Sequence, residues 1–390
     1  MHLFFSVGEP SGDQHAAHLI QELQSRNPRT RCVGFGGPAM EAAGCKLNFR
    51  LTDMAVMGIF AVIPLLWKFY KVAQQAKKYF RENRPDAVIL IDFASFNWWI
   101  AKYAKQEGIR VIFYLPPQIW AWADWRIKKI RRFADDVIVG LPFEQQWYAD
   151  RGVKVEYVGH PFFDEVAEHR TDNHFLECWK SQKYRNVAIL PGSRREEVQH
   201  NFPIMIEVMK QLHERHPDVR FLVACYREEH RRFCSSYLMA HASRLPVHLF
   251  VGKTPEIIQA SLCCSMVSGS VSLEVLARGK PAVVQYTTDW FTYLVGKSMV
   301  KCRFMTLPNL FVNREVFPEF FVIGSTAKYV TRITEVLHGW LSVQERLDAV
   351  TDDVEQLRDQ FAQTGATKRA AAHLLQRLEP ADTLRPARAA

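Results

Sequence analysis

The sequence lacks the common signatures of a bound metal or a disulfide framework. Its 390 residues contain no DxD pair, no HExxH and no cluster of cysteine and histidine with metal-binding spacing. The eight cysteines include no CxxC pair, and several lie in apolar, strand-like runs, which is typical of buried thiols in a reducing compartment. We therefore expect a cytoplasmic protein that needs no metal and no other cofactor.

Long apolar runs are missing as well. The uncharged stretch at residues 54–67 contains Gly58 and Pro64 and is shorter than the roughly 20 residues that span a bilayer. The apolar residues 3–7 have no basic leader and run directly into Gly8, so they are expected to form a first strand and not a signal peptide. The sequence predicts no transmembrane helix.

Positive charge is in excess. There are 50 Lys and Arg residues against 41 Asp and Glu, which gives a formal net charge of +9. Such an excess favours anionic partners, such as phosphates, nucleic acid or an anionic membrane surface. Net charge alone does not distinguish these partners, so the distinction has to come from the motifs described below.

The order of apolar runs indicates two α/β domains. A chain of this length exceeds the roughly 250–300 residues at which one core stops growing, and short β-rich runs alternate with helical patterns, as in βαβ units with parallel sheets. Strands are expected at residues 3–7, 86–91, 110–114, 136–139 and 155–158, and again at 186–190, 220–225, 247–250, 263–268 and 281–286. We predict Rossmann-like domains over residues 1–165 and 166–340, facing each other across a cleft. Helices over 341–379 are expected to pack back toward the first domain, and a tail occupies 380–390.

The turn after the first strand reads Gly8-Glu9-Pro10-Ser11-Gly12-Asp13. It matches neither the GxGxxG dinucleotide fingerprint nor a P-loop. Its two acids make it a poor pyrophosphate cradle and a better hydrogen-bonding site for sugar hydroxyls, so Glu9, Ser11, Gly12 and Asp13 are candidates for binding an acceptor sugar. The alternative is a tight turn followed by a helix cap.

Asp92 ends the apolar strand at residues 87–91 and precedes Phe93-Ala94-Ser95-Phe96-Asn97. A carboxylate held there could act as a general base on an incoming hydroxyl, a role worth about 10²–10⁴ in rate. Asn97 is grouped with the acceptor-binding candidates. The alternative for Asp92 is a helix cap.

Two turns in the second half offer groups for an anion. Pro191-Gly192-Ser193-Arg194 follows a strand and places backbone amides and a guanidinium at one point, where Arg194 could bind phosphate oxygens. Ser268-Gly269-Ser270 follows another strand and opens a helix, and Glu274 is expected to hold ribose hydroxyls. A solvated surface turn and an ordinary capped helix are the respective alternatives. With no metal expected, a leaving diphosphate would be stabilised by Arg194 and helix dipoles.

The apolar segment at residues 54–67 is followed by basic residues, which suggests contact with a membrane surface. The basic residues are Lys68, Lys71, Lys77 and Lys78, and this combination is suited to a membrane interface. A buried core helix is the alternative. The residues of this predicted membrane and acyl-chain patch are Met57, Ile59, Phe60, Val62, Ile63, Leu65, Leu66 and Trp67.

Read in order, these motifs resemble the lipid-A-disaccharide synthase family, and the resemblance runs over nearly the whole chain. Its landmarks are Gly8 to Asp13, Ala55-Val56-Met57-Gly58, Ile91-Asp92, Trp120-Ala121-Trp122, Leu141-Pro142-Phe143-Glu144, Gly159-His160-Pro161, Leu190 to Arg194, Ser268-Gly269-Ser270 with Glu274, and Leu307-Pro308-Asn309-Leu310.

The resemblance implies a GT-B fold and an inverting glycosyltransferase of lipid A (lipopolysaccharide) biosynthesis. The reaction implied is transfer of 2,3-diacylglucosamine from UDP to 2,3-diacylglucosamine 1-phosphate, with a β-1',6 linkage and release of UDP and without a metal. The second half would bind the UDP sugar through Gly192, Ser193 and Arg194, with Ser268–Ser270 near the pyrophosphate and Glu274 and Asn309 near the nucleoside. Asp92 matches the family's essential aspartate.

The resemblance also implies where such a protein works: at the cytoplasmic face of the inner membrane of a Gram-negative cell, as a peripheral protein on an anionic surface. No nucleic acid partner is expected, and a homodimer is left open. Two positions depart from the family pattern, Ser95 and Ala61, where acids are usual; both bear on acceptor binding and acyl-chain preference. The alternatives are another UDP-sugar transferase or epimerase of the same fold, or a non-catalytic module that binds UDP or a membrane.

Overall fold

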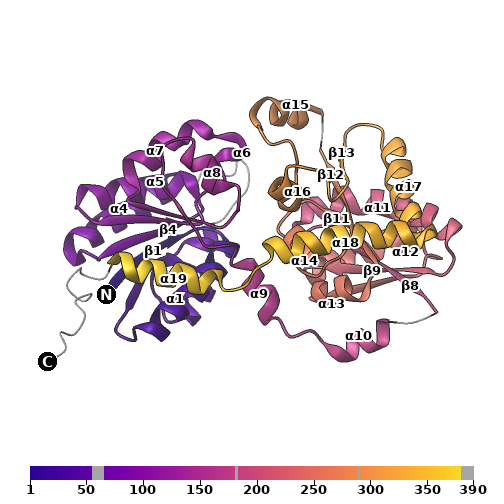
Figure 1. Ribbon diagram of the computed structural model, residues 1–390, viewed down its shortest axis with the longest axis horizontal. Helices are drawn as coiled ribbons and strands as arrows, with labels where there is room; N and C mark the ends of the chain where they lie inside the picture. Colours follow the sequence, from indigo (N-terminus) through magenta and orange to yellow (C-terminus); the bar gives the residue numbers. More distant parts are fainter. Residues whose placement is uncertain (55–65, 181–182, 289, 379–390) are drawn as a thin grey trace. The chain divides into compact units, whose positions relative to one another are not determined.

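The computed structural model describes residues 1–54, 66–180, 183–288 and 290–378. The chain divides into two compact units (Figure 1). Unit 1 comprises Met1–Asp164 with Thr364–Ala390, and unit 2 comprises Glu165–Gln363. Each unit has its own parallel sheet and its own apolar core, as expected for two domains of this size.

In the described part of unit 1, seven strands form a parallel sheet in the order β3-β2-β1-β4-β5-β6-β7. Their bounds are β1 His2–Val7, β2 Arg31–Gly36, β3 Lys46–Arg50, β4 Ala87–Ile91, β5 Arg110–Tyr114, β6 Asp136–Val139 and β7 Glu156–Tyr157. Strands β2 and β3 were not predicted. Strand β3, at the edge of the sheet, alternates polar and apolar residues and resembles a loop in the sequence.

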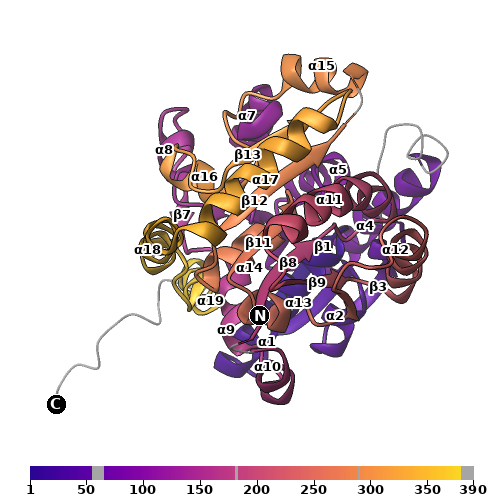
Figure 2. The ribbon, with the colours of Figure 1, turned by 90° about the vertical axis from the view of Figure 1, so that its right-hand side faces the viewer.

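Helices cover both faces of this sheet (Figure 2). On one face lie α4 (Leu66–Asn83), α5 (Ala94–Gln106) and α7 (Ile127–Phe133), and on the other α1 (Pro10–Arg26) and α19 (Ala366–Leu378). Successive residues of a strand point to opposite faces, so Phe4 packs with the first set and Leu3 and Phe5 with the second. Both faces are buried, which explains the uninterrupted apolar run of β1. The remaining helices of this region are α2 (Pro38–Ala42), α6 (Ile119–Trp122), α8 (Glu144–Ala149) and α9 (Phe162–Glu168), with 3-10 turns η1 (Leu51–Met54) and η3 (Asp124–Arg126).

The described part of unit 2 repeats the plan with six strands in the order β10-β9-β8-β11-β12-β13, all parallel. The strands are β8 Arg185–Leu190, β9 Val219–Cys225, β10 Val247–Val251, β11 Cys263–Val267, β12 Ala282–Thr287 and β13 Glu319–Val322. The helices are α10 Asn173–Trp179, α11 Arg195–Arg215, α12 Glu228–His241, α13 Thr254–Ala260, α14 Val271–Ala277, α15 Trp290–Met299, α16 Leu307–Val312, α17 Ala327–Ser342 and α18 Gln344–Phe361.

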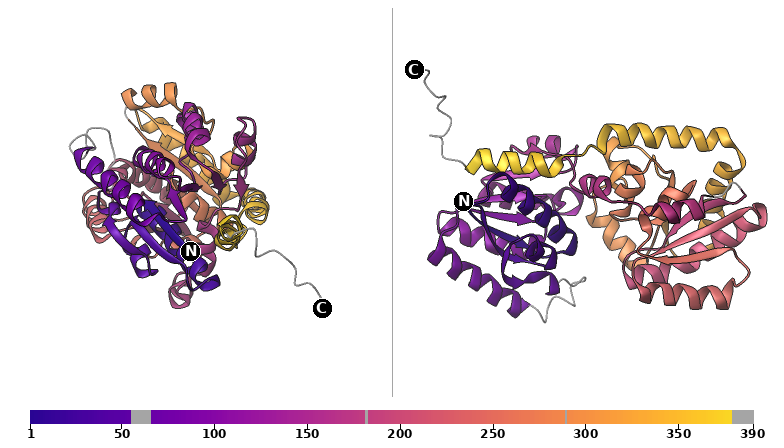
Figure 3. Two further views of the ribbon diagram at one scale, coloured as in Figure 1. Left: turned by 90° about the vertical axis from the view of Figure 1, so that its left-hand side faces the viewer. Right: turned by 90° about the horizontal axis from the view of Figure 1, so that it is seen from below.

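The C-terminal helices, which the sequence analysis grouped over residues 341–379, are divided between the units (Figure 3). Helix α18 packs on α14 and α17 within unit 2, whereas α19 packs on α1 of unit 1. The carboxylate of Asp164, at the end of the first segment of unit 1, accepts hydrogen bonds from the backbone N–H groups of Gly365 and Thr367 at the start of α19. Hydrogen bonds therefore link the residues of unit 1 that lie next to the two points where the chain passes between the units. None of the described helices has both the length and the apolar character needed to cross a membrane.

Each sheet has one point at which the order of strands reverses direction. In unit 1 this point lies between β1 and β4, and in unit 2 between β8 and β11. In open α/β sheets, ligands bind outside the carboxyl ends of the strands at such a reversal. All four turns singled out in the sequence follow these four strands.

Candidate functional sites at the two strand reversals

The reversal in unit 1 brings the turn after β1 next to Asp92 after β4. The two strands are paired, with Val7 opposite Ile91. The ring of Phe93 lies against Gly8, where a Cβ atom would come within 2.2 Å of the ring. Only glycine permits this approach, so the two turns, far apart in the sequence, meet at the sheet edge.

Asp92 is presented by a strained turn. Both Asp92 and Phe93 have left-handed backbone conformations, with φ of 41° and 46°, which cost about 1–2 kcal/mol each for residues other than glycine. The side-chain amide of Asn97 donates hydrogen bonds to the carbonyls of Asp92 (2.8 Å) and Ile91 (3.1 Å), and its oxygen accepts one from the Ser6 hydroxyl (2.7 Å). These bonds hold the turn in place.

The chemistry of Asp92 is set by its surroundings. Burial, together with the negative charge of Glu9, raises the pKa of Asp92 to about 7, and a hydrogen bond from the backbone of Phe93 opposes the shift. A carboxyl group with this pKa is far more basic than an exposed aspartate and titrates near neutral pH. Such a group is suited to accept a proton from a hydroxyl.

Three predicted acceptor-binding residues are turned into the fold. Asp13 is buried, and its carboxylate accepts hydrogen bonds from the backbone N–H groups at the start of α2, at 2.8–3.2 Å. Asn97 has no exposed surface, and Gly12 is buried against Val7 and Ile91. These residues therefore hold the turn in its conformation, and their predicted contact with an acceptor stays a prediction. Glu9, half-buried, and Ser11, exposed, remain accessible.

One buried acid near this edge, Glu144, was not among the site residues predicted from the sequence. The carboxylate of Glu144 accepts hydrogen bonds from the indole N–H of Trp120 and the backbone N–H of Leu141, both at 3.0 Å, and complete burial raises the pKa of Glu144 to about 7. Two landmarks of the family resemblance are thereby joined, the segments after β5 and β6. The sequence signal for this residue was its position: Glu144 is an acid at the start of the helix that follows strand β6.

In unit 2, the turn after β8 carries an accessible cation. Gly192 has a φ of 122°, and the carboxylate of Glu197 accepts hydrogen bonds from the backbone N–H groups of Ser193 (3.1 Å) and Arg194 (3.2 Å) at the start of α11. The guanidinium of Arg194 forms an ion pair with the same carboxylate, yet 58% of the Arg194 side chain is exposed. An incoming anion could replace Glu197 as the partner of these donors.

The second turn of unit 2 is tied to a distant loop. Ser268 donates its hydroxyl hydrogen bond to the carbonyl of Met305 (3.1 Å), while Gly269 and Ser270 are exposed. Glu274 is largely buried and forms an ion pair with Arg278 (3.3 Å); burial raises its pKa. This ion pair joins residues one helical turn apart on α14, and the predicted contact of Glu274 with ribose hydroxyls stays a prediction.

Asn309, predicted near the nucleoside, is fully buried in the fold. Its side-chain oxygen accepts hydrogen bonds from the backbone N–H groups of Val316 and Phe317, and its amide donates to Phe317 and Glu319, all at 2.8 Å. Glu319 also accepts hydrogen bonds from the backbone N–H groups of Met305 and Thr306. Asn309 thus shapes the loop that Ser268 contacts, and its place near the nucleoside stays a prediction.

The predicted membrane patch is only partly within the described residues. Met57, Ile59, Phe60, Val62, Ile63 and Leu65, together with the departure at Ala61, lie outside them. Leu66 and Trp67, in the first turn of α4, are exposed, and Trp67 stacks on Tyr70 with ring centroids 5.5 Å apart. Lys71 lies over the Trp67 ring at 5.6 Å. Ser95, the other departure, is exposed on α5.

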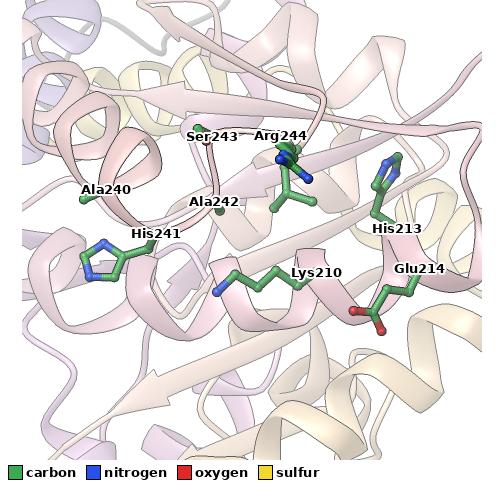
Figure 4. Close-up of a pocket in the computed structure, with 9 residues that line it drawn as sticks. Lys210, His213, Glu214, Ala240, His241, Ala242, Ser243 and Arg244 are labelled. Atoms are coloured by element: carbon green, nitrogen blue, oxygen red, sulfur yellow. The ribbon is translucent and has the colours of Figure 1, made fainter.

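A surface pocket of about 570 Å³ lies in unit 2, away from both turns. It is formed by Lys210, His213 and Glu214 near the end of α11, by His241 at the end of α12 and by Arg244 beyond α12 (Figure 4). Helix α11 begins next to Arg194, and at about 1.5 Å per residue Lys210 is roughly 22 Å further along the axis. The pocket is therefore separate from the reversal point. Among the described residues, no three His, Cys, Asp or Glu side chains are grouped so as to hold a metal ion.

Comparisons with known proteins agree with these features. A family model described as lipid-A-disaccharide synthetase matches residues 3–373. The lipid-A-disaccharide synthase of Geobacter metallireducens is 32% identical over 373 residues, covering 95% of this chain and 96% of the relative. The enzyme of that name from Myxococcus xanthus is 33% identical over 375 residues, covering 96% and 97%.

Among solved structures, the UDP-GlcNAc 2-epimerase of Neisseria meningitidis bound to UDP-GlcNAc aligns with a TM-score of 0.63, over 96% of this chain and 99% of that one. At 14% identity, this similarity concerns the fold alone. Together with the two parallel sheets, it confirms the predicted α/β class with Rossmann-like domains of the GT-B type.

Proposed function

The chain belongs to the lipid-A-disaccharide synthase family, and from this premise we propose how its residues carry out the glycosyl transfer. The reaction joins 2,3-diacylglucosamine, delivered as its UDP derivative, to 2,3-diacylglucosamine 1-phosphate through a β-1',6 linkage, and UDP leaves. Unit 1 binds the acceptor and unit 2 binds the UDP sugar.

Asp92 is the general base of this proposal. The observation that carries the assignment is a carboxyl group at the β1/β4 reversal with a pKa raised to about 7. Asp92 removes the proton from the acceptor's 6-hydroxyl as that oxygen attacks the anomeric carbon. Because the attack occurs opposite the leaving UDP, the configuration inverts.

Arg194 and the amides at the start of α11 stabilise the diphosphate as it leaves. This role is supported by the exposed guanidinium and by two backbone N–H groups that already bind a carboxylate, Glu197. Preorganised donors of this kind are worth about 10²–10³ in rate when one is removed. Ser268–Ser270 lies at the neighbouring strand end and completes the donor site.

The membrane contribution of unit 1 comes from Leu66 and Trp67 with Lys71. An exposed tryptophan next to a lysine fits an anionic interface. We therefore place the protein at the cytoplasmic face of the inner membrane, where both acylated substrates reside.

One experiment tests the reaction itself. The purified protein is incubated with the UDP-diacyl sugar, with and without the acylated sugar phosphate, and UDP and disaccharide are measured. Equal amounts of UDP and disaccharide, formed only when the acceptor is present, are expected. UDP release without acceptor, or 2-epimerisation of the donor sugar, would contradict the proposal.

A further inference from the structure

Helix α15 of unit 2 exposes an unusual amount of apolar surface. Trp290 is 62% exposed and Leu294 50%, and Met299 and Val300 at its end are about half exposed. Figure 1 shows α15 standing out from the sheet and helices of its own unit. Contiguous exposed apolar residues of this kind mark surfaces that bind a partner.

The aromatic residues of this region form a connected group. Trp290 stacks on Tyr293 with ring centroids 5.7 Å apart, and Tyr293 contacts Phe321, an exposed residue of the edge strand β13, at 6.0 Å. Trp290, Tyr293 and Leu294 are three and four residues apart, so they share one face of the helix. We call the group the α15 surface; it consists of Trp290, Tyr293, Leu294, Met299, Val300 and Phe321.

Basic residues outnumber acidic ones in the sequence of α15 and the segment after it. Residues 290–313 include no Asp or Glu, but they include Lys297, Lys301 and Arg303. Lys301 and Arg303 are exposed, and the Arg303 guanidinium lies 5.1 Å from the ring of Phe304. Exposed aromatic and aliphatic side chains next to exposed basic residues are typical of an interfacial helix on anionic lipid.

The α15 surface is also connected to the donor turn. Helix α15 follows β12, whose carboxyl end lies on the same sheet edge as those of β8 and β11. The segment after α15 runs to Met305, whose carbonyl accepts the hydrogen bond from Ser268. A lipid contact at α15 would therefore lie along the chain next to the residues that bind the UDP sugar.

We propose that the α15 surface docks on an anionic bilayer and gives unit 2 its own membrane contact, separate from Leu66 and Trp67 of unit 1. This inference rests on the proposed function, because a sugar that carries two acyl chains must reach unit 2 with those chains still in lipid. The net positive charge of residues 289–313, which contain Lys297, Lys301 and Arg303 against Asp289, favours anionic lipid over a second copy of this chain, whose net charge is +9.

Hydrogen–deuterium exchange on the full chain tests the docking locally. The protein is mixed with vesicles of phosphatidylethanolamine and phosphatidylglycerol, or with vesicles of phosphatidylcholine alone, without any sugar substrate. We expect slower exchange in residues 290–303 with the anionic vesicles only. Unchanged exchange there, or equal protection by neutral vesicles, would overturn the proposal. Protection that grows with protein concentration and needs no vesicles would instead identify an interface between copies.

Variants sharpen the test. Leu294→Glu should abolish the protection of α15 by anionic vesicles, whereas Met239→Glu, at a residue of α12 that is 74% exposed, should leave it intact. The double variant Lys301→Ala/Arg303→Ala should weaken vesicle binding in flotation by about fivefold for each basic side chain removed. Equal flotation of the wild type and the double variant would contradict a contribution of Lys301 and Arg303 to binding anionic lipid.

The outcome separates this inference from the proposed reaction. Normal disaccharide synthesis in detergent with no protection of α15 would overturn only the docking surface. Protection of α15 without any disaccharide synthesis would overturn only the proposed reaction. UDP binding, measured by calorimetry, should be the same in Leu294→Glu and wild type, which shows that the variant is folded.

Discussion

The two strand reversals use the same geometry for opposite purposes. In unit 1, the side chain at the reversal is a partly buried acid, Asp92, on a strained turn that is held by hydrogen bonds from Asn97. In unit 2, the side chain at the reversal is an exposed cation, Arg194, with one internal partner, Glu197. Burial raises the basicity of a carboxylate, whereas a guanidinium needs access to meet a phosphate. In the proposed function, the same strand order therefore presents a general base on one sheet and an anion site on the other.

The largest effect is expected from removing the base of unit 1. Asp92→Asn should lower kcat by about 10²–10⁴ and leave UDP binding unchanged, because the proposed donor site lies in unit 2. Steady-state kinetics and calorimetry measure the two quantities. Asp86→Asn is a matched control, since Asp86 lies before the other end of β4 and accepts a hydrogen bond from the His2 backbone. If Asp92→Asn turned over at the wild-type rate, Asp92 would not be the general base, and the proposed contrast between the two strand reversals would be wrong.

The cation of unit 2 should give the next largest effect. Arg194→Ala is expected to lower kcat/KM by about 10²–10³, because the leaving diphosphate loses a charged donor. The neighbouring exposed residue provides the control: Arg195→Ala should change the rate little. If both variants behaved alike, the effect would reflect the general positive charge and not a specific contact.

The support behind Asp92 can be tested by stability. Asn97→Ala leaves the Ser6 hydroxyl and three backbone carbonyls without their buried partner, which should lower the free energy of unfolding by about 1–3 kcal/mol. It should also reduce kcat, since the turn that presents Asp92 loosens. Urea denaturation measures the first effect. If Asn97→Ala had the same free energy of unfolding as the wild type, the hydrogen bonds of Asn97 would not be needed to hold the turn at Asp92.

The smallest effect concerns pH. Because the pKa of Asp92 is raised to about 7, the base is protonated below that value, and kcat/KM should fall about tenfold from its plateau by pH 6. The same shift makes the fold less stable as pH rises from the unfolded pKa of Asp, about 4, to 7, because the folded state holds a proton that the unfolded state has released. Asp92→Asn should therefore lose less stability over this range than wild type. A rate constant that is flat between pH 5.5 and 8 would contradict the raised pKa.

Much of the fold was predictable because its signals are local. Continuous apolar runs such as residues 87–91 correspond to strands buried on both faces, and β4 spans those residues. The short edge strand β3 was missed because only every second residue is partly covered, so its sequence carries little apolar signal. The division of the C-terminal helices was also missed, since a helix shows which face is apolar but not which unit that face packs against.

The individual site residues were harder to predict than their turns. Asp92, Arg194, Glu9 and Ser11 lie where a substrate could reach them. Asp13, Asn97 and Asn309 have the same polar character in the sequence but satisfy backbone groups inside the protein. Sequence spacing does not distinguish these cases, because a capping carboxylate and a substrate-binding carboxylate follow strands in the same way.

The sequence by itself determined the α/β class, the family and the four turns at which ligands are expected, because these depend on patterns within short segments. Only the tertiary structure decided which polar side chains in those turns point inward. Asn97 meets Ser6, 91 residues away, because β1 and β4 are neighbours in the sheet, and the raised pKa of Asp92 arises from burial and from Glu9 across the same pair of strands. Burial and electrostatic coupling depend on distances between segments, and those distances exist only once the sheet has formed.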